Sequence, residues 1–167
     1  MVDFSRLVPD ERLFPTDAFR QSLNRVMRRK GARLLGYGHP LGYPDLRNYI
    51  AERMRLHGVT VRPEQVLLTT GSQNAIELVL KLMAPSGSTV VLESPTYSAA
   101  LPLFRHHGVR LLDVPMTDDG PDLAAVETVF RTGTPSLFYT IPNFHNPTGI
   151  TTGHAHRERL LELACQY

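Results

Sequence analysis

Short apolar segments alternate with longer amphipathic segments over most of this chain, and this alternation constrains the fold more than any other feature. Apolar residues that recur every three or four positions predict helices, whereas short apolar runs between turn residues predict buried strands. Strands that alternate with helices through short connections are typical of parallel sheets. The pattern predicts strands at residues 66–70, 89–93, 110–114 and 137–141, and helices at 72–83, 97–107, 122–131 and 153–166.

The predicted fold class is therefore α/β. Its expected architecture is a partial three-layer sandwich, in which helices cover both faces of a mostly parallel sheet. The helix at 72–83 is apolar nearly all round, so we expect it to be buried on most sides. For the domain organisation, we predict that residues 1–45 contain an N-terminal arm, a helix and a glycine-rich segment, and that residues 46–167 contain the sheet.

The first part of the chain lacks strand-like runs. Prolines interrupt residues 1–16, which predicts an irregular arm, and the periodicity predicts a helix at 17–29 with Thr16 or Asp17 as its cap. A second helix is expected to begin at Pro44. Its apolar positions, which we expect to face inward, are Leu46, Ile50, Met54 and Leu56.

The composition excludes several classes of protein. The 167 residues are 42% hydrophobic and carry a formal net charge of +2 without a long basic run, so no nucleic-acid-binding face is indicated. No apolar run approaches the roughly 18 residues of a membrane-spanning helix, and a single cysteine excludes a disulfide framework. No signal peptide is visible at the start. These features predict a globular, cytoplasmic protein without a membrane partner.

Ligands bind at the carboxyl ends of strands in open α/β sheets, so the residues that follow the predicted strands are candidates for a binding site. Gly71, Ser72 and Gln73 follow the first strand. Free backbone amides and the positive end of a helix suit an anion such as phosphate at this position. An alternative remains open, because Thr70 and Gln73 have the spacing of a capping box.

Two further strand ends carry unusual residues. Tyr97 follows the second strand and places an aromatic ring at the rim of the crevice that we expect at these strand ends. A single tyrosine at this position also suits core packing. Asn146 follows the fourth strand in a turn with Pro142 and Pro147, which restrict the backbone and hold the amide in a set direction. An ordinary strand-to-helix loop is the alternative. Together, the three strand ends favour a flat, phosphorylated heterocycle as the ligand.

The histidines do not have the spacing of metal ligands. His154 and His156 lie two positions apart, and His106 and His107 are adjacent, so neither pair shares one face of a helix. We therefore expect no metal site.

Three motifs, in their order and spacing, resemble a known family. The segments TTGSQNAIEL, ESPTYSAAL and IPNFHNPTG are similar to the large domain of fold-type I, class I and II aminotransferases, which use pyridoxal 5′-phosphate (PLP). The segments DFSRLVPDERLFP and YGHPLGYPDLRNYIAERM look closest to the aminotransferase-like domain of MocR-type GntR regulators and to aminoadipate-type aminotransferases. By this resemblance, residues 46–167 would be an incomplete large domain that contains its PLP-binding half.

The resemblance implies roles for the residues at the three strand ends. Gly71, Ser72 and Gln73 correspond to the loop that holds the cofactor phosphate. Tyr97 corresponds to the aromatic residue that stacks on the pyridine ring. Asn146 corresponds to the asparagine that hydrogen-bonds the ring hydroxyl. In such enzymes the cofactor is the electron sink, and the protein supplies orientation and control of protonation.

The resemblance also implies a homodimer, and the sequence departs from the family pattern in its lysines. Tyr37 resembles the tyrosine that reaches the partner's cofactor phosphate across a homodimer interface. The family's Schiff-base lysine lies downstream of the NPTG motif, and Lys30 and Lys81 are the only lysines here, at other positions. We therefore expect no catalytic residue in this chain, and no transaminase turnover, because aldimine exchange requires a nucleophilic amine.

Two functions remain open at this point. The chain would be a fragment of an aminotransferase that moves an amino group between an amino acid and a 2-oxo acid. Alternatively, it would be the effector-binding and dimerising domain of a MocR/GntR-type transcription regulator. Nucleic acid would then be a partner only through an upstream winged-helix domain.

Overall fold

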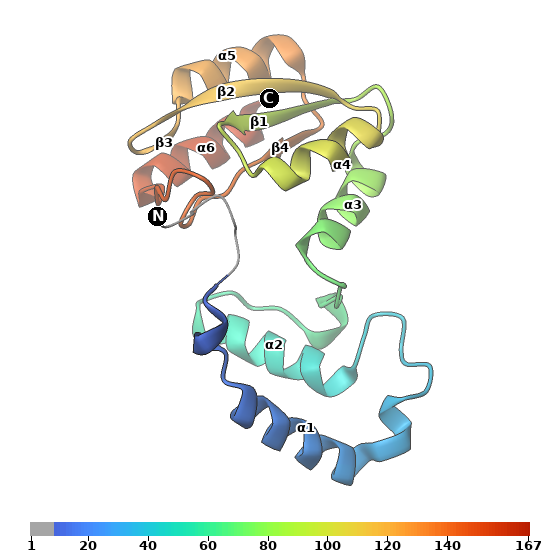
Figure 1. Ribbon diagram of the computed structural model, residues 1–167. Helices are drawn as coiled ribbons and strands as arrows, with labels where there is room; N and C mark the ends of the chain where they lie inside the picture. The colour runs from blue at the N-terminus through green and yellow to red at the C-terminus, as the bar shows by residue number, and fades with distance from the viewer. Residues whose placement is uncertain (1–8) are drawn as a thin grey trace. The chain divides into compact units, whose positions relative to one another are not determined.

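The computed structural model describes residues 9–167, which fall into two compact units that divide after Leu68, the second being Thr69–Tyr167 (Figure 1). We refer to them as unit 1 and unit 2. The predicted division after residue 45 concerns the family's domains and stays a prediction, whereas the compact units divide after Leu68. The first half of the predicted arm lies outside the described residues.

Unit 2 is built on a four-stranded sheet with the order β3-β2-β1-β4. The central strand β1 (Thr89–Ser94) pairs in parallel with β2 (Arg110–Thr117) on one side and with β4 (Leu137–Tyr139) on the other. The short strand β3 (Gly120–Pro121) returns antiparallel to the end of β2. The mostly parallel sheet of the predicted α/β fold is therefore confirmed.

Helices cover both faces of this sheet because successive β1 side chains point to opposite sides. Val90 and Leu92 pack with α3 (Ser72–Met83) and α4 (Leu101–His106), which follows the short 3₁₀ turn η4 (Ser98–Ala100). Val91 packs in a second cluster with side chains of α5 (Leu123–Gly133) and α6 (His154–Gln166). The two clusters confirm the partial three-layer sandwich.

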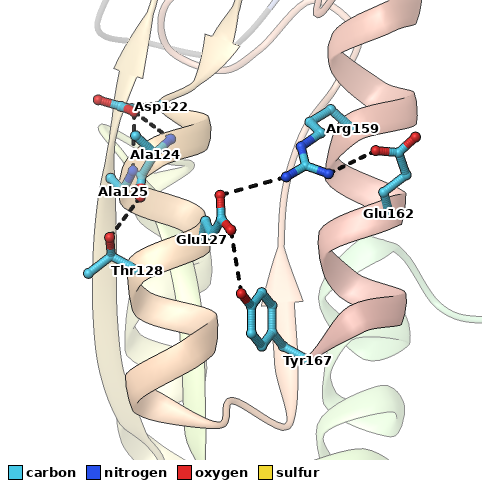
Figure 2. A network of polar contacts seen from close by, with 8 residues as sticks. All are labelled: Asp122, Ala124, Ala125, Glu127, Thr128, Arg159, Glu162 and Tyr167. Atoms are coloured by element: carbon cyan, nitrogen blue, oxygen red, sulfur yellow. Dashed lines mark hydrogen bonds and ion pairs between the residues drawn. The ribbon is translucent and has the colours of Figure 1, made fainter.

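Polar contacts join the outer surfaces of α5 and α6. Glu127 of α5 lies between Arg159 and Tyr167 (Figure 2). Its Oε2 is 3.6 Å from Arg159 Nη2, and its Oε1 accepts a hydrogen bond from the Tyr167 hydroxyl (3.4 Å). At the start of α5, the Asp122 carboxylate accepts hydrogen bonds from the backbone amides of Ala124 and Ala125 (2.9 and 3.2 Å). This side-chain cap satisfies two of the amides that a helix N-terminus leaves without partners.

Two predictions about unit 2 and its boundary are wrong. Residues 66–70 form no strand, since no described strand lies beside them to complete a ladder. Helix α3 is not buried on most sides, because it packs on the sheet through one side only. Leu80 is fully buried, whereas Val79 and Leu82 are 43% and 80% exposed.

Unit 1 is helical. It contains η1 (Glu11–Leu13), α1 (Thr16–Lys30), η2 (Gly31–Leu34), α2 (Pro44–Leu56) and η3 (Pro63–Gln65). Both predicted helices are present. The predicted cap of α1 is wrong, because the helix begins one residue earlier than expected, behind Pro15, which has no side chain that can accept a hydrogen bond.

Helix α2 buries a different face from the predicted one. Its buried residues are Arg47 and Ala51, while Leu46 and Leu56 are 45% and 78% exposed. The Arg47 guanidinium reaches across unit 1 and donates a hydrogen bond to the carbonyl of Pro63 (3.0 Å). The segment after α2 therefore folds back over the arginine side of the helix and not over its leucine side.

A glycine allows this return. The amide of Leu68 donates a hydrogen bond to the carbonyl of Leu41 (3.0 Å), and the neighbouring Gly42 has a φ of 95°. A Cβ atom at this position would lie 2.6 Å from the Leu68 side chain. Glycine is thus required by the backbone conformation and by the close approach of residue 68.

Candidate functional site

The loop before α3 leaves its backbone amides free of side-chain caps. Gly71 is the N-cap residue, with a φ of 123°, and no side chain caps the helix. The capping box that the sequence left open is therefore not formed. Instead, the Gln73 side-chain amide donates a hydrogen bond to the carbonyl of Ala99 (3.3 Å), which links this loop to the loop after β1.

The loop after β1 carries Tyr97, which is partly buried against the core on the α3 and α4 side of the sheet. Beside it, the Thr96 hydroxyl is buried without a hydrogen-bond partner in the described part of the chain. Burial, together with the negative charge of Glu93 and the proximity of Tyr97, raises the pKa of Tyr139 on β4. The end of β1 therefore brings aromatic rings close to a carboxylate.

The turn after β4 is anchored to α6. Arg157 donates hydrogen bonds to the carbonyls of Pro142 and Thr152 (2.9 and 2.7 Å) and to the side-chain oxygen of Asn143 (2.7 Å). The peptide bond before Pro147 is cis. The sequence singled out Asn146 on this turn, and the structure shows that the neighbouring Asn143 holds the turn instead, through its bond to Arg157.

Asn146 differs from Asn143 in its surroundings. Its side chain is partly buried, and it makes no hydrogen bond to any residue in the described part of the chain. Asn146 is thus the amide of this turn that remains available to a ligand.

A buried contact between a carboxylate and a histidine lies beneath the turn and was not predicted from the sequence. Glu93 and His145 are both fully buried, with His145 Nε2 3.1 Å from Glu93 Oε2. The distance is within ion-pair range, although the ring N–H is not well aligned for a hydrogen bond. The available signals were an acidic residue at the end of an apolar strand and a histidine next to the predicted asparagine.

The structure links the predicted site residues of unit 2 to one another. Gly71, Ser72 and Gln73 start α3, and the Gln73 bond ties them to the segment that begins at Tyr97. Glu93 in turn ties the end of β1 to the Asn146 turn through His145. Tyr37 belongs to unit 1, where its side chain is fully exposed.

Neither lysine lies at these strand ends. Lys30 Nζ contacts Asp45 and the Tyr43 hydroxyl in unit 1, and Lys81 pairs with Glu77 in the last turns of α3 (2.6 Å), away from the start of that helix. Among residues 9–167, no group of His, Cys, Asp and Glu side chains has a metal-binding arrangement. No helix in this part of the chain is long and apolar enough to cross a membrane.

Comparisons with known proteins agree with this architecture. The profile of the family described as aminotransferase class I and II matches residues 8–167. The crystal structure of an α-aminoadipate aminotransferase from Thermus thermophilus, complexed with N-(5′-phosphopyridoxyl)-L-leucine, superimposes with a TM-score of 0.87. It is 42% identical, over 95% of this chain and 40% of that one.

Curated relatives include both an enzyme and a regulator. A 2-aminoadipate transaminase of Thermus thermophilus is 41% identical over 99% of this chain and 41% of its own length. An uncharacterised HTH-type transcriptional regulator of Escherichia coli is 31% identical over 100% of this chain and 36% of its own length. The chain thus spans about two fifths of the relatives that it matches. By its sequence profile and its structure, this chain belongs to the class I and II aminotransferases, a family of PLP-dependent enzymes.

Proposed function

We propose that this chain supplies part of the PLP-binding portion of an aminotransferase that transfers an amino group between an amino acid and a 2-oxo acid. The observation that carries the proposal is the Asn146 amide, which has no hydrogen-bond partner among residues 9–167, on a turn that Glu93 joins to the strand end before Tyr97. When bound, PLP acts as the electron sink for chemistry at the amino acid. The protein's part is to orient the ring and to control protonation.

The residues at the strand ends fit a phosphorylated ring. Helix α3 has no side-chain cap, and a Cβ at Gly71 would meet no atom within 4 Å, so the amides of the first turn are accessible. Ser72 and Gln73 would hold the phosphate there, where the helix dipole favours an anion. The unpartnered hydroxyl of Thr96 is a further polar group at the neighbouring loop.

The remaining residues would hold the ring. Tyr97 would stack on the pyridine ring through the exposed part of its side chain, and Asn146 would hydrogen-bond the ring hydroxyl. Tyr37 would reach the phosphate of the partner subunit in a cytoplasmic homodimer. Its full exposure and the exposed apolar side chains of α1, such as Phe19, support a role at an interface.

The proposal predicts binding without covalent attachment to this chain. PLP added to the chain should bind without internal-aldimine absorbance, and borohydride treatment should leave Lys30 and Lys81 unmodified, because neither lysine lies at the strand ends. Asn146→Ala should weaken PLP binding by up to roughly tenfold, since a hydrogen bond contributes up to about 1.5 kcal/mol. Asn24→Ala, at an exposed position of α1, is the matched control. Equal affinities of the two variants would contradict the proposal.

A second function is favoured by the regulator relative, which matches the whole chain. In this case the same strand ends would bind a ligand as part of an effector-binding and dimerising domain. The genomic sequence on both sides of the segment distinguishes the two functions. An upstream helix-turn-helix region would support the regulator, and an uninterrupted start would support the enzyme.

A further inference from the structure

The carboxylate of Glu93 joins three segments below the surface of unit 2. It accepts hydrogen bonds from the Thr140 hydroxyl (2.5 Å) and from the backbone amide of Ile141 (2.9 Å), and it pairs with His145. A buried charge is tolerated only where hydrogen bonds and an opposite or polar partner compensate for the lost water. The end of β1 is thereby fastened to the end of β4 and to the turn that follows it.

The imidazole of His145 carries this connection into the turn. Its Nδ1 lies 2.8 Å from the Thr148 hydroxyl oxygen, which also accepts a hydrogen bond from the amide of Ile150 (3.3 Å). The backbone amide of Thr148 also donates to Nδ1 (3.4 Å), so Nδ1 acts as an acceptor and the Thr148 hydroxyl donates its proton to it. The ring proton then lies on Nε2, 3.1 Å from Glu93 Oε2 although not well aligned with it, so the contacts at Nδ1 select one tautomer.

Backbone hydrogen bonds close the turn around the same histidine. The amide of His145 donates to the carbonyl of Ile150 (2.8 Å), and the amide of Gly149 donates to the carbonyl of His145 (2.5 Å). Asn146 lies in the part of the turn that these two hydrogen bonds enclose. Because its side chain has no partner in the described part of the chain, the position of its amide depends on the backbone that His145 and Thr148 hold.

We propose that Glu93 and His145 are positioning residues that hold the turn so that the Asn146 side chain is presented for ligand binding. This inference rests on the proposed function only for the identity of the ligand, PLP. Neither residue needs to contact the cofactor, because Glu93 holds the backbone before Asn146 at Ile141 and His145 contacts Thr148 after it. A pair with a purely structural role would stabilise unit 2 without any coupling to Asn146.

The first test needs no cofactor. In ¹⁵N-labelled chain, the imidazole resonances of His145 should show a protonated Nε2 and an unprotonated Nδ1 as one tautomer. Thr148→Val removes the shorter of the two contacts to Nδ1 at an exposed position, leaves only the backbone amide of residue 148, and should produce a mixture of tautomers. Asp113→Asn, which changes an exposed carboxylate on β2, should leave the resonances unchanged. A single Nδ1–H tautomer in the unsubstituted chain would overturn the proposed network.

The second test measures coupling by a double-mutant cycle. Glu93→Gln should weaken PLP binding by up to the roughly tenfold loss expected for Asn146→Ala, because the amide is then no longer held in place. In the Asn146→Ala background, Glu93→Gln should have no further effect on affinity. Independent, multiplicative losses would overturn the positioning role.

The two tests separate this inference from the proposed function. If the unsubstituted chain bound no PLP, the proposed function would fail, and the tautomer measurement would still decide whether the network holds the turn. If Glu93→Gln did not fold, Thr148→Val would replace it in the cycle, because Thr148 is exposed and lies on the turn itself.

Discussion

The two compact units of this chain bury their apolar residues to very different extents. In unit 2, side chains from both faces of β1 form two buried clusters with four helices. In the described part of unit 1, Ala51 is the one buried apolar side chain, and Phe19 and Leu23 of α1 are 70% and 51% exposed. Both units contain amphipathic helices, but among residues 9–167 only unit 2 has a sheet against which its helices pack.

This difference shows what helical periodicity alone provides. An amphipathic helix gains most of its stability by burying its apolar face against another element. The periodicity predicts that such an element is needed but does not specify which one it is. In unit 2 the sheet is that element. In unit 1 the apolar face of α1 remains exposed, so we expect unit 1 to be the less stable of the two.

The largest expected effect comes from removing a core side chain of unit 2. Phe104 is fully buried and packs edge-on against Tyr139 at 5.4 Å between ring centroids. Phe104→Ala should lower the free energy of unfolding by about 3–5 kcal/mol, because it leaves a cavity. The matched variant Phe19→Ala in unit 1 should change it by less than about 0.5 kcal/mol. Denaturant unfolding followed at residue-resolved probes measures both, and similar losses would contradict the contrast between the units.

A smaller effect distinguishes the helix starts of the two units. Asp122→Ala removes the side-chain cap of α5 and should cost about 1 kcal/mol of stability. Thr16→Ala should cost less than about 0.5 kcal/mol, because no side chain caps α1. Thermal unfolding of the two variants tests this pair. A larger loss for Thr16→Ala would show that the residue caps the helix after all.

The smallest effect concerns an exposed ion pair in each unit. The hydrogen bond from Lys30 lowers the pKa of Asp45 from its ordinary value of 3.8, and the hydrogen bond from Lys81 lowers the pKa of Glu77 from 4.5. A carboxylate whose pKa is lowered in the folded state stabilises the fold at pH values above its ordinary pKa. This stability is lost as the pH falls through the folded-state pKa. Both pairs are exposed, so their contributions are small.

Replacing each carboxylate should change the unfolding of its own unit at low pH and leave the other unit unaffected. Asp45→Asn should reduce the loss of α1 and α2 amide signals on acidification below about pH 4, and Glu77→Gln should do so only in α3. Residue-resolved NMR during an acid titration measures both responses. An effect of Asp45→Asn on α3 would mean that the two units unfold together.

Much of the fold could be predicted from the sequence because it depends on local patterns. The apolar run that forms β1 and the helical periodicities of α5 and α6 were sufficient to predict those elements. The strand predicted at 66–70 was wrong because a ladder needs a neighbouring strand, and no local pattern specifies one. The inward face of α2 was also wrong, since Arg47 packs under a segment that follows the helix.

In the candidate site, too, some features follow from local sequence patterns and others depend on distant segments. The family could be predicted from the motifs around Gly71, Tyr97 and Asn146, which lie at strand ends. The fold was needed to show that Arg157 holds Asn143, that Asn146 has no partner among residues 9–167, and that a buried carboxylate lies beneath the turn. The physical reason is that β1 and β4 pair side by side, which brings Glu93 next to a histidine far along the chain. Local patterns specify what a segment becomes, whereas the partners of its buried polar groups depend on which distant segments the sheet places beside it.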